Sequence, residues 1–63
     1  MFDFLFVATE YSENEGEEIL VECDTLSEAW DTLINRYGFN RKDFHFIERM
    51  SVEEGEMLGL DTY

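Results

Sequence analysis

The sequence predicts an α+β fold: a two-layer ββαβ domain whose three-stranded antiparallel sheet packs on one helix. Three observations predict it. They are a capped amphipathic stretch at residues 25–39, a first segment that is apolar on both of its alternating faces, and two further short segments of strand character. We expect a single domain, 1–63, with a marginal core, because so short a chain buries only about 60% of its unfolded surface.

Residues 2–11 are predicted to form the central strand. Phe4 and Phe6 would line one face of this strand and Leu5 and Val7 the other, because side chains alternate along a strand with a period of two. Strands that are apolar on both faces are usually covered on both sides. We therefore expect this strand in the middle of the sheet.

A polar turn and a second strand follow. The SENEG segment ends in Gly16, which tolerates the positive φ found in hairpin loops. In residues 17–23, apolar side chains alternate with Glu18 and Glu22, the pattern of a half-exposed strand. Charged side chains discourage sheets from pairing edge to edge, so we expect this strand at an edge.

The helix is predicted over TLSEAWDTLINRYGF. Thr25 and Glu28 stand three apart, as in a capping box that satisfies backbone N–H groups at the start of a helix. Gly38 stands where a left-handed residue ends a helix, and Phe39 beyond it can fold back on Ile34. The apolar stripe expected to face the sheet consists of Leu26, Ala29, Trp30, Leu33, Ile34 and Tyr37.

Residues 43–50 are predicted to form a third strand beside the first, which makes all pairs antiparallel and gives the strand order 2-1-3. Ser51 and Glu54 repeat the capping-box spacing, so a short C-terminal helical turn is expected over residues 52–58. The faces of the third strand are expected to carry Phe44 and Phe46 on one side, and His45, Ile47 and Arg49 on the other.

This arrangement leaves the second face of the sheet without an obvious cover. The C-terminal tail, a second copy of the chain in a homodimer, or a binding partner could cover it.

Charge is the strongest global feature. Sixteen Asp and Glu face four Lys and Arg, for a formal net charge of −12, and all four basic residues lie between positions 36 and 49. Solubility alone requires a net charge of only about 2–8 in magnitude for a small domain. An acidic surface repels nucleic acid and anionic lipid and attracts basic partners. We therefore expect a basic protein partner, and neither nucleic acid nor a membrane as a direct partner.

The sequence offers little for catalysis or cofactor binding. His45 is the one histidine and no nucleophile pattern converges on it, while Cys23 stands between two acids that oppose thiolate formation. The ENEGEE stretch lacks the frame of a calcium loop, and one Cys with one His is too few for zinc. We expect no enzyme activity, no catalytic residues, no cofactor and no metal.

The N-terminal MFDFLF has no basic region and does not resemble a signal peptide, and no apolar run reaches the roughly 18 residues that span a bilayer. We therefore expect a cytoplasmic protein.

The carboxylates themselves are the candidate site. On a strand, residues two apart point the same way and lie about 6.6–6.8 Å from each other, so Glu18 and Glu22, four apart, share a face. Rows of fixed negative charge can mimic a phosphate backbone. They can therefore bind a protein whose Lys and Arg side chains bind phosphates. The candidate partner-binding residues are Glu13, Glu15, Glu17, Glu18, Glu22, Asp24, Glu28 and Asp31.

In size, in element order and in the crowding of acids in EYSENEGEEILVECD ahead of TLSEAWDTLINRYGF, the chain resembles small acidic phage-encoded inhibitors of bacterial defence nucleases, including anti-CRISPR proteins. That class has no common sequence motif. The resemblance implies a non-enzymatic inhibitor that blocks a nucleic-acid-binding groove or a Cas-complex interface. Two alternatives stay open: an acidic immunity protein or antitoxin that neutralises a basic nuclease toxin, and a small adaptor that dimerises through its open sheet face.

Overall fold

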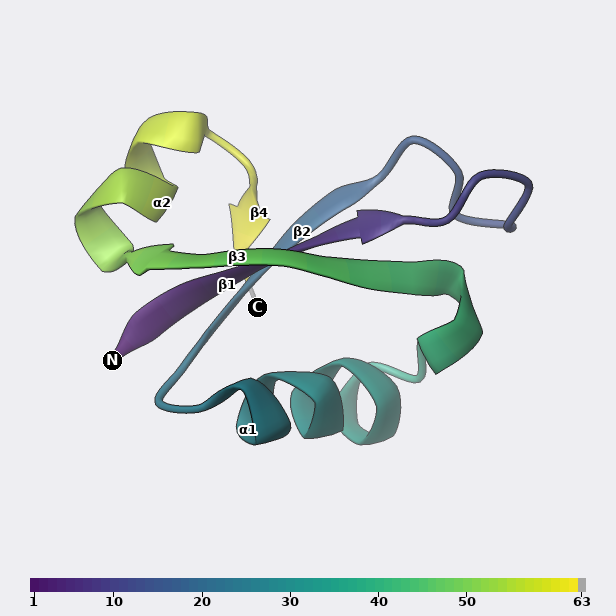
Figure 1. The fold of residues 1–63 in the computed structure, drawn as a ribbon, viewed down its shortest axis with the longest axis horizontal. Coiled ribbons are helices and arrows are strands. Elements are labelled where there is room, and N and C mark those ends of the chain that lie inside the picture. The colour runs from purple at the N-terminus through teal and green to yellow at the C-terminus, as the bar shows by residue number, and fades with distance from the viewer. Residues whose placement is uncertain (63) are drawn as a thin grey trace.

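Figure 1 shows the computed structural model, which describes residues 1–62. β1 (Phe2–Ala8) lies between β2 (Glu18–Cys23) and β3 (Phe44–Ser51), and both pairs are antiparallel. α1 (Leu26–Asp31) lies on one side of this sheet and α2 (Val52–Leu58) on the other. The predicted α+β class, the strand order 2-1-3 and the packing of a helix on the sheet are therefore confirmed.

A short fourth strand, β4 (Asp61–Thr62), extends the sheet beyond β2. It pairs in parallel with β2 opposite Ile19 and Leu20. The expectation that β2 forms an edge is therefore wrong, because the chain after α2 returns along its outer side. Leu20 is fully buried and breaks the half-exposed pattern of an edge strand.

The start of α1 forms as the sequence predicts. The Thr25 hydroxyl oxygen accepts a hydrogen bond from the Glu28 N–H at 3.2 Å, which caps the first turn. Ala29 and Leu33 are fully buried against the sheet. The Trp30 ring lies half-buried beside them.

The second half of the predicted helix is wider than an α-helix. Thr32–Arg36 form a π-helical turn that ends with a hydrogen bond of 3.1 Å from the Tyr37 N–H to the Thr32 carbonyl. Gly38 then takes φ +75°, so the predicted left-handed stop is confirmed. The ring of Phe39 packs against Phe44, with 5.1 Å between ring centroids.

β3 contains a bulge. Leu5 pairs with Glu48 and Phe6 pairs with Phe46, so Ile47 is an extra residue without a partner on β1. A bulge shifts the alternation of faces for the residues that follow it. Even-numbered side chains of β3 therefore point to one face of the sheet before the bulge and to the other face after it.

The bulge overturns one face assignment. Arg49 was expected beside His45 and Ile47, but the register places it opposite Phe4, on the side that faces α1. Its guanidinium carbon lies 4.3 Å from the centroid of the Phe2 ring. Periodicity cannot foresee this because a bulge depends on the pairing with the neighbouring strand.

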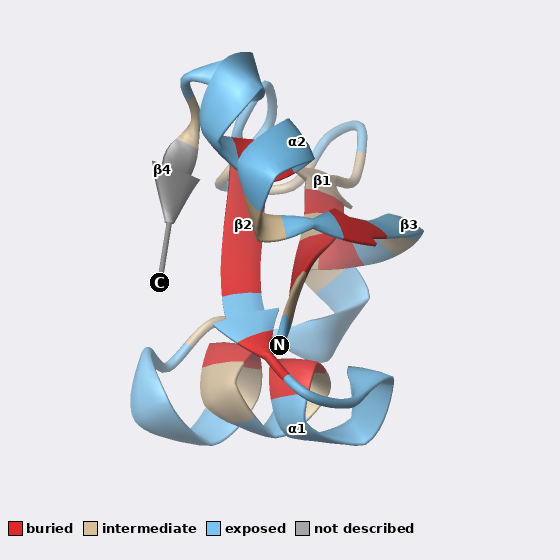
Figure 2. Cartoon of the chain, turned by 90° about the vertical axis from the view of Figure 1, so that its left-hand side faces the viewer, coloured by how far each residue is buried: buried red, intermediate tan, exposed pale blue. Residues whose placement is uncertain are grey.

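The core lies between α1 and the sheet, where buried stretches of the strands meet the helix (Figure 2). Phe6 is at its centre, with Trp30 at 4.7 Å and Phe46 at 5.8 Å between ring centroids, both in edge-on geometry. The buried cluster consists of Phe4, Phe6, Ile19, Val21, Cys23, Ala29, Leu33 and Phe44.

α2 covers part of the second face of the sheet, so the C-terminal tail, one of the three covers left open by the sequence, lies over that part. Ser51 caps α2 by accepting a hydrogen bond from the Glu54 N–H at 3.2 Å, and Gly55 packs over Asp3. The rest of this face is only partly covered, and Ile47 is 53% exposed. We call the remainder the open half; it consists of Leu5, Val7, Glu18, His45, Ile47 and Glu48.

Candidate functional site

All eight acids singled out in the sequence have exposed side chains, and they fall into three groups. The hairpin loop carries Glu13, Glu15 and Glu17, and β2 carries Glu18 and Glu22. The third group lies before and along α1 and consists of Asp24, Glu28 and Asp31, the last residue of the helix.

The groups face different sides of the molecule. Glu18 and Glu22 lie opposite Val7 and Asp3, so the two share the second face as their spacing predicted. Glu28 belongs to α1, in the layer on the other side of the sheet. The eight acids therefore do not form one continuous row; they surround the fold.

The hairpin loop that carries the first group is a series of tight turns. Its ends are joined by a hydrogen bond from the Ala8 N–H to the Glu17 carbonyl at 2.9 Å, and the Glu15 N–H bonds to the Ser12 carbonyl at 3.2 Å. Tyr11 takes φ +69°, an uncommon conformation for a residue other than glycine, and its side chain is 89% exposed. The loop thus holds its carboxylates out into solvent.

Few of these carboxylates have a cationic partner. Thirteen of the fifteen acidic residues whose exposure is described are exposed. Among residues 1–60, whose side chains the structure describes, the one ion pair joins the amino group of Met1 to Asp24 at 3.5 Å. Asp31 accepts a hydrogen bond from the Asn35 amide at 2.6 Å. The negative charge of the surface is therefore largely uncompensated by the chain's own cations.

Three of the four basic residues instead lie over aromatic rings. A cation over a ring face is attracted by the ring quadrupole, and the arrangement turns the arginines toward the protein. The distances from guanidinium carbon to ring centroid are 5.8 Å for Arg36 over Tyr37, 4.5 Å for Arg41 over Trp30, and 4.3 Å for Arg49 over Phe2.

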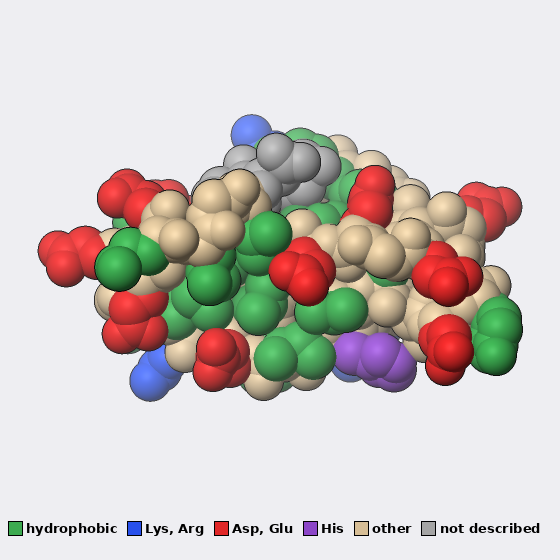
Figure 3. Space-filling model, turned by 90° about the horizontal axis from the view of Figure 1, so that it is seen from above, with side chains coloured by type: hydrophobic (Ala, Val, Ile, Leu, Met, Phe, Trp, Pro, Cys, Tyr) green, Lys and Arg blue, Asp and Glu red, His purple; other side chains and the backbone are tan. Residues whose placement is uncertain are grey.

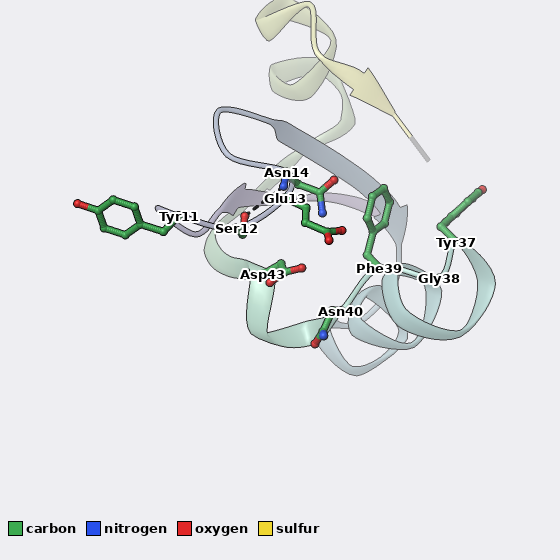
Figure 4. Close-up of a pocket in the computed structure, with 9 residues that line it drawn as sticks. All are labelled: Tyr11, Ser12, Glu13, Asn14, Tyr37, Gly38, Phe39, Asn40 and Asp43. Atoms are coloured by element: carbon green, nitrogen blue, oxygen red, sulfur yellow. Dashed lines mark hydrogen bonds between the residues drawn. The ribbon is translucent and has the colours of Figure 1, made fainter.

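An open cleft of about 560 Å³ lies between the hairpin loop and the chain that links α1 to β3 (Figure 4). Thr9 ties the two segments together, because its N–H donates to the Asp43 carbonyl at 2.7 Å and its hydroxyl donates to the Lys42 carbonyl at 2.8 Å. Glu13 and Asp43 contribute two carboxylates, whereas the Tyr11 side chain points away. The lining consists of Tyr11, Ser12, Glu13, Asn14, Tyr37, Gly38, Phe39, Asn40 and Asp43.

Cys23 lies in the core, as expected for a small apolar residue. Its thiol is buried and donates a hydrogen bond to the Thr25 carbonyl at 3.3 Å. Burial raises the pKa of this thiol, and the carboxylates of Glu28 and Asp24 raise it further. Cys23 is therefore held as a thiol.

One titratable residue escaped the sequence reasoning. Asp3 is 1% exposed, and its Oδ1 has no hydrogen-bond partner among the described residues. Burial raises the pKa of this carboxyl, and the charges of Glu22 and Glu56 raise it further. The signal was present in MFDFLF, because an acid between two phenylalanines, on a strand expected to be covered on both faces, is a candidate for burial.

Among residues 1–60, no group of three His, Cys, Asp or Glu side chains is placed to hold a metal ion. Within the same range, no helix has the length and apolar character needed to cross a membrane. Comparison with protein-family models, characterised proteins and solved structures gave no significant match.

Proposed function

We propose that this protein is a non-enzymatic inhibitor that binds the basic nucleic-acid-binding surface of a bacterial defence nuclease in the bacterial cytoplasm. Its acidic side chains would occupy the place of phosphates. The observation that supports this proposal is the uncompensated charge. The exposed carboxylates have almost no ion pairs within the described chain, while three arginines lie over rings.

Uncompensated carboxylates suit this role on physical grounds. A nucleic-acid-binding groove holds Lys and Arg that neutralise phosphates, and carboxylates on a rigid scaffold can pair with the same side chains. Carboxylates already paired with the chain's own cations would gain less from a basic partner. The hairpin group is suited to enter such a groove, since the loop projects from one end of the sheet (Figure 1).

The test is capture from bacterial lysate with the protein as bait, followed by elution with either rising salt or double-stranded DNA. We expect a basic nuclease or Cas complex to be released by both, because salt screens the contacts and DNA competes for the same groove. The purified target should then lose nuclease activity when the protein is added.

A double charge reversal provides the matched control. Glu17→Lys with Glu18→Lys should abolish capture, whereas Glu53→Lys with Glu54→Lys, on α2 at the other end of the molecule, changes the net charge equally and should retain most of it. Capture that survives the first pair, or that DNA does not reverse, contradicts the proposal.

A further inference from the structure

We propose that the open half of the second face binds an amphipathic basic helix of the partner, with apolar residues along its centre and Lys or Arg on its flanks. This inference rests on the proposed function only in taking the partner to be basic. The inference adds apolar contacts at the open half to the long-range attraction between the acidic surface and a basic partner.

The strand register places an apolar strip between charged neighbours. Val7 lies between Glu18 on β2 and His45 on β3, so one cross-strand row runs acid, apolar, histidine. In the next row Leu5 is paired with Glu48 on β3. On β2, Leu5 lies opposite Leu20, which is fully buried. Apolar side chains thus follow β1, and the exposed side chains of Glu18, His45 and Glu48 border them on the neighbouring strands.

The bulge enlarges this strip. Ile47 is the unpaired residue of β3 and follows Phe46, which packs on the α1 side, so it projects to the other side and is 53% exposed. Leu5 and Val7 are half-buried beside it. Figure 3 views this side of the molecule and shows a group of hydrophobic side chains with Asp and Glu side chains around it.

Among residues 1–60, the elements of the chain cover this strip only in part, since Leu5 and Val7 are half-buried. α2 packs on the row that contains Asp3 and Met50, where its Gly55 makes the closest approach. The opposite face of the same sheet is covered by α1, which shows how a helix can cover a sheet of this size. A second helix beside α2 would complete the cover.

Charge decides which helix fits. A second copy of this chain would bring Glu18 and Glu48 close to another acidic rim, and each copy carries a formal net charge of −12. Like charges brought together at an interface are costly, whereas Lys or Arg flanking an apolar centre would pair with these carboxylates. The carboxylates of Glu18 and Glu48 therefore favour a basic amphipathic helix as the partner over a second copy of this chain.

The test is a titration of the isotope-labelled protein with a synthetic helical peptide of Leu and Lys at amphipathic spacing, followed by amide NMR shifts. A second peptide has the same lysines but serine in place of leucine. We expect the first peptide to shift amides of β1 and β3 at the open half and to bind about tenfold more tightly than the second.

Two variants localise the contact. Ile47→Ser should weaken binding of the leucine peptide about tenfold, while Leu26→Ser, an exposed apolar position on α1, should leave it within about twofold. Shifts in the wild-type protein remain informative if the Ile47 variant does not fold.

Equal binding of both peptides, or shifts confined to the hairpin loop, would overturn the proposal in favour of charge alone. Concentration-dependent dimerisation that Ile47→Ser abolishes would overturn it in favour of a second copy. If the peptide binds as expected but lysate capture yields no nucleic-acid-binding protein, the proposed function fails and the helix site stands.

Discussion

The carboxyl group of Asp3 lies directly beneath Gly55. A Cβ added at Gly55 would overlap Oδ2 of Asp3 and stand 2.7 Å from its Cγ, so only glycine fits at this position of α2. The contact joins the central strand to the C-terminal helix and buries an acidic group that has no hydrogen bond at Oδ1 within the described chain.

Gly55→Ala should lower the free energy of unfolding by about 1–2 kcal/mol. Alanine favours a helix by up to about 1 kcal/mol over glycine, but overpacking against a buried group costs about 1–3 kcal/mol. The measurement is urea unfolding, with Ser27→Ala on exposed α1 as the control. The combined variant with Asp3→Ala should recover part of the loss, because the overlapping atoms are gone. A Gly55 variant as stable as wild type would show that α2 moves freely over β1.

Asp3→Asn should raise the free energy of unfolding near neutral pH, by about 1–3 kcal/mol, because it removes a buried charge that lacks a partner. Burial, then Glu22 and Glu56, hold the pKa of Asp3 above 3.8 in the folded state. A raised pKa contributes stability that is complete below 3.8 and is lost as pH rises through the folded value.

The advantage of Asn over Asp should therefore be small in acid and grow with pH. The measurement is urea unfolding of both proteins from about pH 3 to about pH 8. A difference that stays constant over this range would mean that Asp3 titrates alike in the folded and unfolded chains. Glu53→Gln removes an exposed charge and controls for net charge.

Arg41→Ala should lower the free energy of unfolding by about 0.5–1 kcal/mol, because its guanidinium lies 4.5 Å from the centroid of the Trp30 ring. Trp30 is the chain's one tryptophan, so its fluorescence reports this contact directly. Lys42→Ala removes the same charge from the next residue. It should change the free energy of unfolding and the Trp30 fluorescence less than Arg41→Ala does. Equal effects of the two substitutions would assign the loss to charge rather than to the ring contact.

Local signals predicted the elements that depend on neighbouring residues. Thr25 and Gly38 stand where a helix start and stop belong, and the structure confirms both. The alternation at Leu5 and Val7 correctly placed β1 at the centre of the sheet. Each of these features is decided within a few residues, which is why the sequence displays it.

Features that depend on distant partners could not be predicted in this way. The bulge at Ile47 exists only in the pairing with β1, and the two residues of β4 are too few to show a pattern. The same limit applies to the site. Spacing predicted that Glu18 shares a face with Glu22, but only the topology shows that Glu28 lies in the opposite layer.

The acidic surface should make folding itself depend on salt. Its carboxylates repel one another with few internal cations to compensate, and self-repulsion destabilises a compact chain. Salt screens this repulsion, since the Debye length falls from about 10 Å at 0.1 M to about 3 Å at 1 M. We expect the free energy of unfolding to rise with NaCl, by about 1 kcal/mol at the top of this range.

Glu17→Lys with Glu18→Lys should reduce this rise, because two units per substitution bring the net charge from −12 to −8. The neutral pair Glu17→Gln with Glu18→Gln should give an intermediate slope. Both proteins are compared with wild type by urea unfolding at fixed pH. A stability that falls with salt would mean that attractive pairs dominate the surface. The acids would then already be engaged within the molecule and have little left to offer a basic partner.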